Sequence, residues 1–256
     1  ALMDSPFLDY VQGMKAKGVV HHIGLSTHNP DVAKKAVLSG IVEMILFSIN
    51  PAFDMMPPTE NIDDYFDGKY DGAREGIAPE RAELYRLCEQ HNVGITVMKG
   101  FAGGRLFKAE TSPFGVALTP VQCIHYALTR PAVASILAGF DEPAHVEEAM
   151  SYETASEAER DYASVLAGAP KHAYSGQCTY CGHCKPCPMD IDIAMVNKLY
   201  DLATMQAEVP ASVREHYRAL KTNASDCVGC GGCETRCPFH VPVVERMEKA
   251  AELFGK

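Results

Sequence analysis

Two short cysteine-rich runs near the C-terminal end of the chain restrict its fold more than any other feature. They hold eight of the ten cysteines among the 256 residues. The first run has a cysteine at every third position and ends in Cys187-Pro188, whereas the second widens its last interval by one residue before Cys237-Pro238. Thiolates spaced in this way lie around one loop, and what they bind decides how this part of the chain folds. The runs consist of Cys178, Cys181, Cys184 and Cys187, and of Cys227, Cys230, Cys233 and Cys237.

The spacing of the second run is the one by which bacterial ferredoxins hold a 4Fe-4S cluster, and the first run is one residue shorter. In two-cluster ferredoxins the fourth cysteine, which precedes proline, ligates the other cluster. We therefore predict two 4Fe-4S clusters with crossed ligation. The shorter interval before Cys187 leaves the partner of that cysteine open. The predicted sets are Cys178, Cys181 and Cys184 with Cys237, and Cys227, Cys230 and Cys233 with Cys187.

Zinc and disulfides are the competing interpretations of the cysteine runs. Four thiolates saturate a tetrahedral zinc ion, and two Cys-x2-Cys pairs are sufficient for it. A zinc site does not need the terminal Cys-Pro steps, so a zinc-binding structural domain is the weaker interpretation. Disulfides between such close neighbours would be strained, and the sequence shows no secretory signal. The spacing therefore favours iron–sulfur clusters.

Composition and charge exclude several classes of function. The net charge of -10 argues against binding to nucleic acid, whose phosphates would repel the protein. No apolar run has the length of a membrane span, so we expect no membrane segment and a reducing, cytoplasmic location. A hydrophobic content of 47% is sufficient for a buried core. Because the runs begin only after residue 170, we predict two domains, at residues 1–168 and 169–256.

The first of these segments alternates between strand and helix patterns. Apolar periodicity and caps predict strands at 19–25, 42–49, 93–98 and 133–137, and helices at 5–17, 30–39, 79–92, 119–130 and from 142. Four strand–helix units with parallel pairing make half of an eight-stranded barrel. Residues 50–78, which include the acidic pair Asp63-Asp64, interrupt the alternation and read as a functional lid or a disordered excursion. The second segment predicts helices at 191–205, 211–221 and 241–254.

Several stretches resemble a known family. Residues 18–26, 94–106, 119–122 and 130–139, in this order, resemble the C-terminal half of an aldo/keto reductase barrel. Residues 170–256 resemble the ferredoxin-like tail of the iron–sulfur branch of that family, with Ala-Ser-Asp-Cys before the second run and Cys-Pro-Phe-His-Val-Pro at its end. The resemblance implies an α/β fold, part of a (β/α)8 barrel followed by a small helical domain. It also implies an oxidoreductase that exchanges electrons with a redox partner protein or a small-molecule acceptor, and a homo-oligomer is compatible with it.

The same resemblance implies a partial site for NAD(P). Ser26 matches the position that binds the nicotinamide carboxamide, and the glycines after residue 99 would let backbone N–H groups approach a pyrophosphate. His145 replaces the arginine that grips the 2'-phosphate of NADP. In a simpler interpretation the glycines make only a tight turn and Ser26 caps a helix. The predicted cofactor-binding residues are Ser26, Lys99, Gly103, Gly104, Arg105 and Glu148.

The acid–base residues of the family, an Asp, a Tyr, a Lys and usually a His, belong to its first four strand–helix units. The resemblance places those units upstream of Ala1, so we assign no catalytic residue in this chain. An alternative function follows from the same pattern: an electron-carrier module whose barrel half is a structural platform without a nucleotide.

Overall fold

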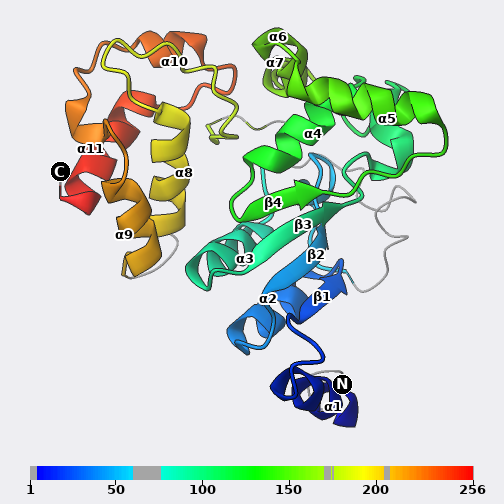
Figure 1. The fold of residues 1–256 in the computed structure, drawn as a ribbon. Coiled ribbons are helices and arrows are strands. Elements are labelled where there is room, and N and C mark those ends of the chain that lie inside the picture. The colour runs from blue at the N-terminus through cyan, green and yellow to red at the C-terminus, as the bar shows by residue number, and fades with distance from the viewer. Residues whose placement is uncertain (1–4, 60–75, 170–173, 175, 205–207, 256) are drawn as a thin grey trace.

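A computed structural model describes residues 5–59, 76–169, 174, 176–204 and 208–255 of the chain. Its sheet has four parallel strands in the order β1-β2-β3-β4, which is also their order in the sequence. Helices follow the strands (Figure 1), so the predicted α/β class is confirmed and the arrangement is that of part of a (β/α)8 barrel. The strands are β1 (Gly24–Thr27), β2 (Met44–Ser48), β3 (Gly94–Met98) and β4 (Val133–Ile136).

The helices around the sheet begin where the sequence predicts them. Asn29 caps α2 by accepting from the backbone N–H groups of Asp31 and Val32, and Thr119 begins α4 with a capping box. The predicted segment 50–78 contains a buried 3-10 turn, η2 (Phe53–Met55), whereas Asp63 and Asp64 lie outside the described residues. The helices are α1 (Pro6–Ala16), α2 (Pro30–Leu38), α3 (Pro79–Gln90), α4 (Pro120–Thr129), α5 (Pro143–Met150), α6 (Glu157–Arg160) and α7 (Tyr162–Ala167), with 3-10 turns η4 (Ala102–Phe107) and η5 (Ser151–Glu153).

The two central strands carry the core of this part of the chain. Ile45 and Phe47 of β2 stand opposite Ile95 and Val97 of β3, and all four side chains are fully buried. They pack against a helix layer that includes Cys88 and Cys123, both of which are fully buried. Neither β1 nor β4 contains a fully buried residue, and Met44 on β2 is 48% exposed. The burial is therefore concentrated on one face of β2 and β3.

The predicted strand at 19–25 is wrong in position, because β1 begins only at Gly24. The backbone N–H groups of Val19 and Val20 donate to the carbonyl of Met14, so the end of α1 takes the hydrogen bonds that a strand would use. Val19 is 62% exposed, and α1 itself contains no buried residue. The apolar spacing of α1 therefore predicts the helix correctly but does not place it against a core.

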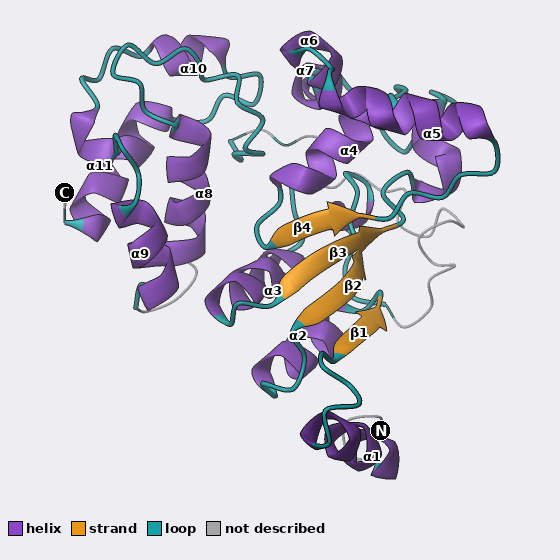
Figure 2. Cartoon of the chain, viewed as in Figure 1, coloured by secondary structure: helices purple, strands orange, loops and turns teal. Residues whose placement is uncertain are grey.

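The C-terminal part is helical, as predicted (Figure 2). Its closing helix packs on its neighbours, and the rings of Tyr217 and Phe254 stack with centroids 3.9 Å apart. None of the helices in the described ranges is long and apolar enough to cross a membrane. The elements are α8 (Ile193–Thr204), α9 (Ala211–Arg218), the 3-10 turn η6 (Ala224–Asp226), α10 (Gly232–Arg236) and α11 (Val243–Phe254).

The C-terminal helices lie beyond the end of the sheet at which the strands start (Figure 1). Helix α9 packs against α3, where His216 lies 3.3 Å from Glu89. Arg130, just before β4, donates to the carbonyl of Thr179 in the first cysteine run. The first cysteine run is thus attached close to the start of β4. The boundary between residues 168 and 169 stays a prediction.

Candidate metal centres and their surroundings

Two hollows in the C-terminal part bring the cysteines of the two runs together. Each hollow contains three cysteines from one run and the fourth cysteine of the other, which is the arrangement that crossed ligation requires. The ligation itself stays a prediction. The cysteines of the first hollow are Cys178, Cys181, Cys184 and Cys237. The cysteines of the second hollow are Cys187, Cys227, Cys230 and Cys233.

Tight turns direct the cysteines of each run toward their hollow. Gly182 has a φ of 86° and begins a turn in which the N–H of Lys185 donates to its carbonyl, 3.0 Å away. Gly231 has a φ of 71° and precedes α10. Side chains with a Cβ are strained in this left-handed region, so glycine at these positions lets the chain bend between neighbouring cysteines.

Arg236 ties the two runs together. Its guanidinium donates to the carbonyl of Cys184 at 2.7 Å and to that of Pro186 at 2.8 Å. Arg236 is the last residue of α10 and directly precedes Cys237. These hydrogen bonds therefore hold Cys237 near the first run, and the sequence alone offers no sign of this role.

The residues present fit an iron–sulfur cluster in each hollow. The walls supply four thiol groups each and are otherwise largely apolar, with Phe239 and Val241 in the first and Val244 and Met247 in the second. All ten cysteines are free. Among the described residues, no three His, Cys, Asp or Glu side chains converge as ligands of a single metal ion. In a 4Fe-4S cube the thiolates bind different irons, so their sulfurs stand apart.

Arg130 anchors the loop of the first run to the sheet-bearing part. The hydroxyl of Tyr162 donates to the same Thr179 carbonyl at 2.6 Å, and Arg130 is almost fully buried. The guanidinium stacks on two rings, with its central carbon 4.5 Å from the centroid of Tyr126 and 5.1 Å from that of Tyr180. Because Thr179 stands between two predicted ligands, this contact fixes the position of the first hollow relative to α4.

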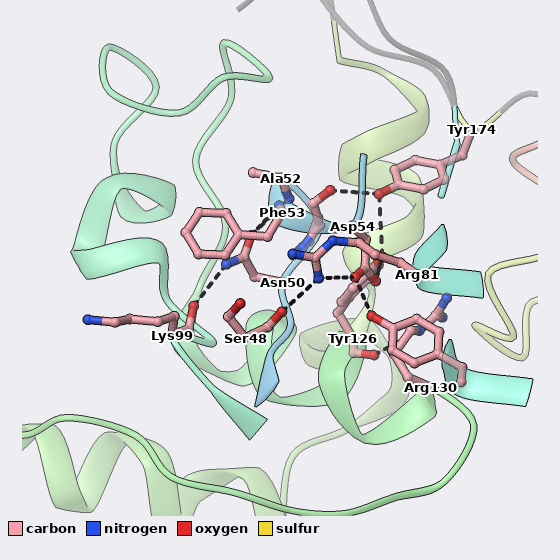
Figure 3. Close-up of polar contacts among 12 residues, drawn as sticks. Ser48, Asn50, Ala52, Phe53, Asp54, Arg81, Lys99, Tyr126, Arg130 and Tyr174 are labelled. Carbon is pink, nitrogen blue, oxygen red and sulfur yellow. Dashed lines mark hydrogen bonds and ion pairs between the residues drawn. The ribbon is translucent and has the colours of Figure 1, made fainter. Parts of the chain in front are cut away.

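A buried carboxylate, Asp54, organises the interior behind that anchor (Figure 3). Its two oxygens accept hydrogen bonds from Tyr85 at 2.5 Å and from Tyr126 at 2.7 Å, and Arg81 lies 3.5 Å away. Burial, and then the charge of Asp54, raise the pKa of Tyr85 well above its ordinary value, so the phenol remains protonated and donates. No pattern in the sequence marks Asp54, which lies in a segment without periodicity.

The network also reaches the segment that leads into the first run (Figure 3). The hydroxyl of Tyr174 donates to the carbonyl of Pro51 at 2.8 Å and lies 3.4 Å from the hydroxyl of Tyr126. Arg81 donates to the carbonyl of Ser48 at 2.8 Å. One buried network thus links the end of β2 to α3, to α4 and to the entry of the cysteine-rich segment.

The predicted nucleotide residues lie at the other end of the sheet. Ser26 is exposed in β1, and Lys99 is exposed directly after β3, where its carbonyl accepts from the side chain of Asn50 at 2.8 Å. Burial, and then the charges of Lys99 and Arg81, lower the pKa of His28 after β1. Lys99 is thus the exposed cation that these two loops place near His28.

The remaining nucleotide residues are arranged less favourably. Gly103 and Gly104, with φ of 65° and 84°, make the kink in η4 that precedes Arg105, as the simple-turn interpretation requires. Glu148 is exposed on α5. His145 of α5 pairs with two acids that precede this helix, 2.6 Å from Asp141 and 3.3 Å from Glu142. Nucleotide binding by this group stays a prediction.

Comparison with known proteins bears on both parts of the chain. Residues 174–241 match a protein-family model described as a 4Fe-4S dicluster domain. This segment is similar to such a domain. We refer to residues 174–241 as the dicluster segment, and it contains all eight cysteines of the two hollows.

Among solved structures, the chain is similar to aldo-keto reductase AKR11C1 from Bacillus halodurans in its holo form. The TM-score is 0.45 and the sequence identity 17%, over 64% of this chain. The match spans 57% of the length of that reductase. No curated protein matches the chain.

Proposed function

We propose that this chain transfers electrons through two 4Fe-4S clusters and that these clusters serve an oxidoreductase unit of the aldo/keto reductase type. The observation that carries the proposal is the sorting of eight cysteines into two hollows by the crossed pattern, within a segment that matches a dicluster family model. When bound, 4Fe-4S clusters supply one-electron transfer at a potential set by hydrogen bonds, charge and exposure.

The two hollows differ in how far the surrounding residues shield them from solvent. The first hollow is held against α4 by Arg130 and Tyr162, and its apolar wall keeps water away from the thiolates. The second hollow is closer to solvent, because Cys230 is exposed and the neighbouring Val228 is 63% exposed. We therefore propose that electrons pass between the protein and an external redox partner at the second run.

The geometry also supports a second candidate function. Barrels of this class build their active sites at the carboxyl ends of the strands, where Ser26 and Lys99 lie. The first cysteine run instead contacts Arg130, which precedes β4 at the opposite end of the sheet. This separation favours an electron-carrier module in which the sheet-bearing part is a platform and no nucleotide exchanges electrons with the clusters.

Two measurements on anaerobically purified protein test these proposals. We expect a brown protein with about eight irons per chain, since each of two cubes holds four. A colourless preparation with two tightly bound zinc ions would refute the iron–sulfur function. Bleaching of the visible absorption by NADPH or NADH would establish the coupled oxidoreductase, and bleaching by dithionite alone would establish the electron carrier.

A further inference from the structure

A cleft that adjoins the first cysteine hollow lies between the sheet-bearing part and the dicluster segment. Its lining residues come from α4, α6 and α7 on one side and from the loop of the first run and α8 on the other. Its volume is about 650 Å³, which lies within the range of about 300–1,000 Å³ typical of small-molecule sites. Leu128 and Met195 contribute apolar surface, and Tyr162 and Tyr180 contribute rings. Cys181 lies in the same wall.

Two of the acidic side chains in the cleft wall already have partners. Asp161 accepts from the backbone N–H of Ser164 at 2.8 Å with one oxygen, and its other oxygen lies 3.0 Å from His183. Asp192 accepts from the N–H of Met195 at 3.1 Å and so caps α8. Glu157, the remaining acid, is exposed in the first turn of α6. Of these three acids, Asp161 pairs with a basic side chain, whereas Asp192 is bound by a backbone N–H.

The same wall also contains four basic side chains. Lys185, Lys198, Arg160 and Arg236 all line the cleft, and none of them forms an ion pair with a carboxylate in the described part of the chain. The two arginines donate to backbone carbonyls instead. The wall thus holds four cations and three acids, and two of the cations, Lys185 and Arg236, are exposed to solvent.

Lys198 differs from the exposed cations Lys185 and Arg236 in being withdrawn from solvent. It is half-buried, and its ammonium lies 5.6 Å from the centroid of the Tyr180 ring. Burial, followed by the charge of Arg130, lowers the pKa of Lys198 to about 8, against the opposing effect of Glu89 and Asp192. A partly desolvated ammonium without a carboxylate partner is stabilised by any anion that enters beside it.

We propose that this cleft binds a small organic carboxylate, with the carboxylate at Lys198 and the apolar body against Leu128 and Met195. The half-buried ammonium of Lys198, which has no carboxylate partner among the described residues, favours an anion, and the apolar surface and rings favour an organic body over a bare inorganic ion. The inference deepens the proposed function, because Cys181 in the same wall places the bound molecule beside the first cluster. The cleft is then the site for the small-molecule partner of the electron-transfer unit.

Calorimetric titration of the full chain with benzoate and with benzamide tests the proposal. The two probes have the same ring, but only benzoate carries a charge. We expect benzoate to bind at least about tenfold more tightly than benzamide. We also expect Lys198→Gln to weaken benzoate binding by at least about tenfold and to leave benzamide binding unchanged. Lys249→Gln, on the exposed face of α11 where Lys249 pairs with Glu245, is the control and should change neither.

Equal binding of the two probes by the unaltered protein, or no binding of benzoate at about 10 mM, would overturn the proposal. This comparison needs no variant, so it holds even if Lys198→Gln fails to fold. Iron is measured on the same sample. An iron-loaded protein that does not bind benzoate refutes the cleft site alone, whereas an iron-free protein that selects benzoate over benzamide refutes the cluster function alone.

Discussion

Replacing Asp54 with asparagine alters a fully buried carboxylate on which Tyr85, Tyr126 and Arg81 converge. Hydrogen bonds to a charged group contribute about 1.5–3 kcal/mol each, and removing one partner of a buried ion pair costs about 3–5 kcal/mol. Asparagine keeps one acceptor oxygen and the shape of the side chain but removes the charge opposite Arg81. We therefore expect Asp54→Asn to lower the free energy of unfolding by about 3 kcal/mol.

Urea unfolding under anaerobic conditions, followed by circular dichroism, measures this loss. The matched control is Asp31→Asn, which removes an ion pair with Lys34 at the surface, where Asp31 is 50% exposed. Surface pairs contribute at most about 1 kcal/mol, so the control should change stability little. If Asp54→Asn unfolds within about 0.5 kcal/mol of the unaltered protein, the carboxylate does not hold the network together and our account of this interior is wrong.

Three further predictions concern ligation, pH and a helix cap. Cys187→Ser should perturb the cluster of Cys227, Cys230 and Cys233 more than the one formed by its own run, and damage confined to its own run, seen by Mössbauer or EPR spectroscopy, would mean that the ligation is not crossed. Burial, and then the charges of Arg160 and Arg130, lower the pKa of His125 from 6.5 to about 4. As the pH falls, the imidazole is therefore protonated in the unfolded chain before it is protonated in the folded one. The contribution of the neutral His125 to stability should be fully present above pH 6.5 and should be lost as the pH falls toward 4. With an allowance for the partial exposure of His125, the free energy of unfolding should fall between pH 7 and pH 5 by about 1 kcal/mol more in the unaltered protein than in His125→Gln. An equal fall in the two proteins, measured by urea unfolding at both pH values, would contradict this. Thr119→Ala removes an acceptor 3.2 Å from the N–H of Gln122 and should cost about 1 kcal/mol in the same urea assay, whereas an unchanged midpoint would show that the cap does not stabilise α4.

The sequence predicts those features that depend on neighbouring residues. Cysteine spacing is a local property, so both runs and the sorting of their cysteines into two groups of four could be predicted without a structure. Helix caps are local as well, and Asn29 and Thr119 begin α2 and α4 as predicted. The alternation of strands and helices predicts the parallel α/β arrangement, because two parallel strands must be joined by a crossover connection, which is usually a helix.

The strand predicted at 19–25 shows where local reasoning fails. Its apolar residues suit a strand, but the free carbonyl at the end of α1 accepts their N–H groups first. The choice between the two sets of hydrogen bonds depends on where the preceding helix ends, and the pattern of Val19 to Leu25 alone does not contain that information.

The tertiary structure alone decided which distant groups meet. Asp54 receives hydrogen bonds from residues 31 and 72 positions further along the chain, and Arg236 reaches carbonyls 50 and 52 positions before it. Lys198 has no cleft until α8 is placed opposite α4 and α7. Side-chain type fixes what such a group can bind, but burial and the positions of other charges fix whether it is paired. Those quantities come from packing between elements far apart in the sequence, and they exist only once the chain has folded.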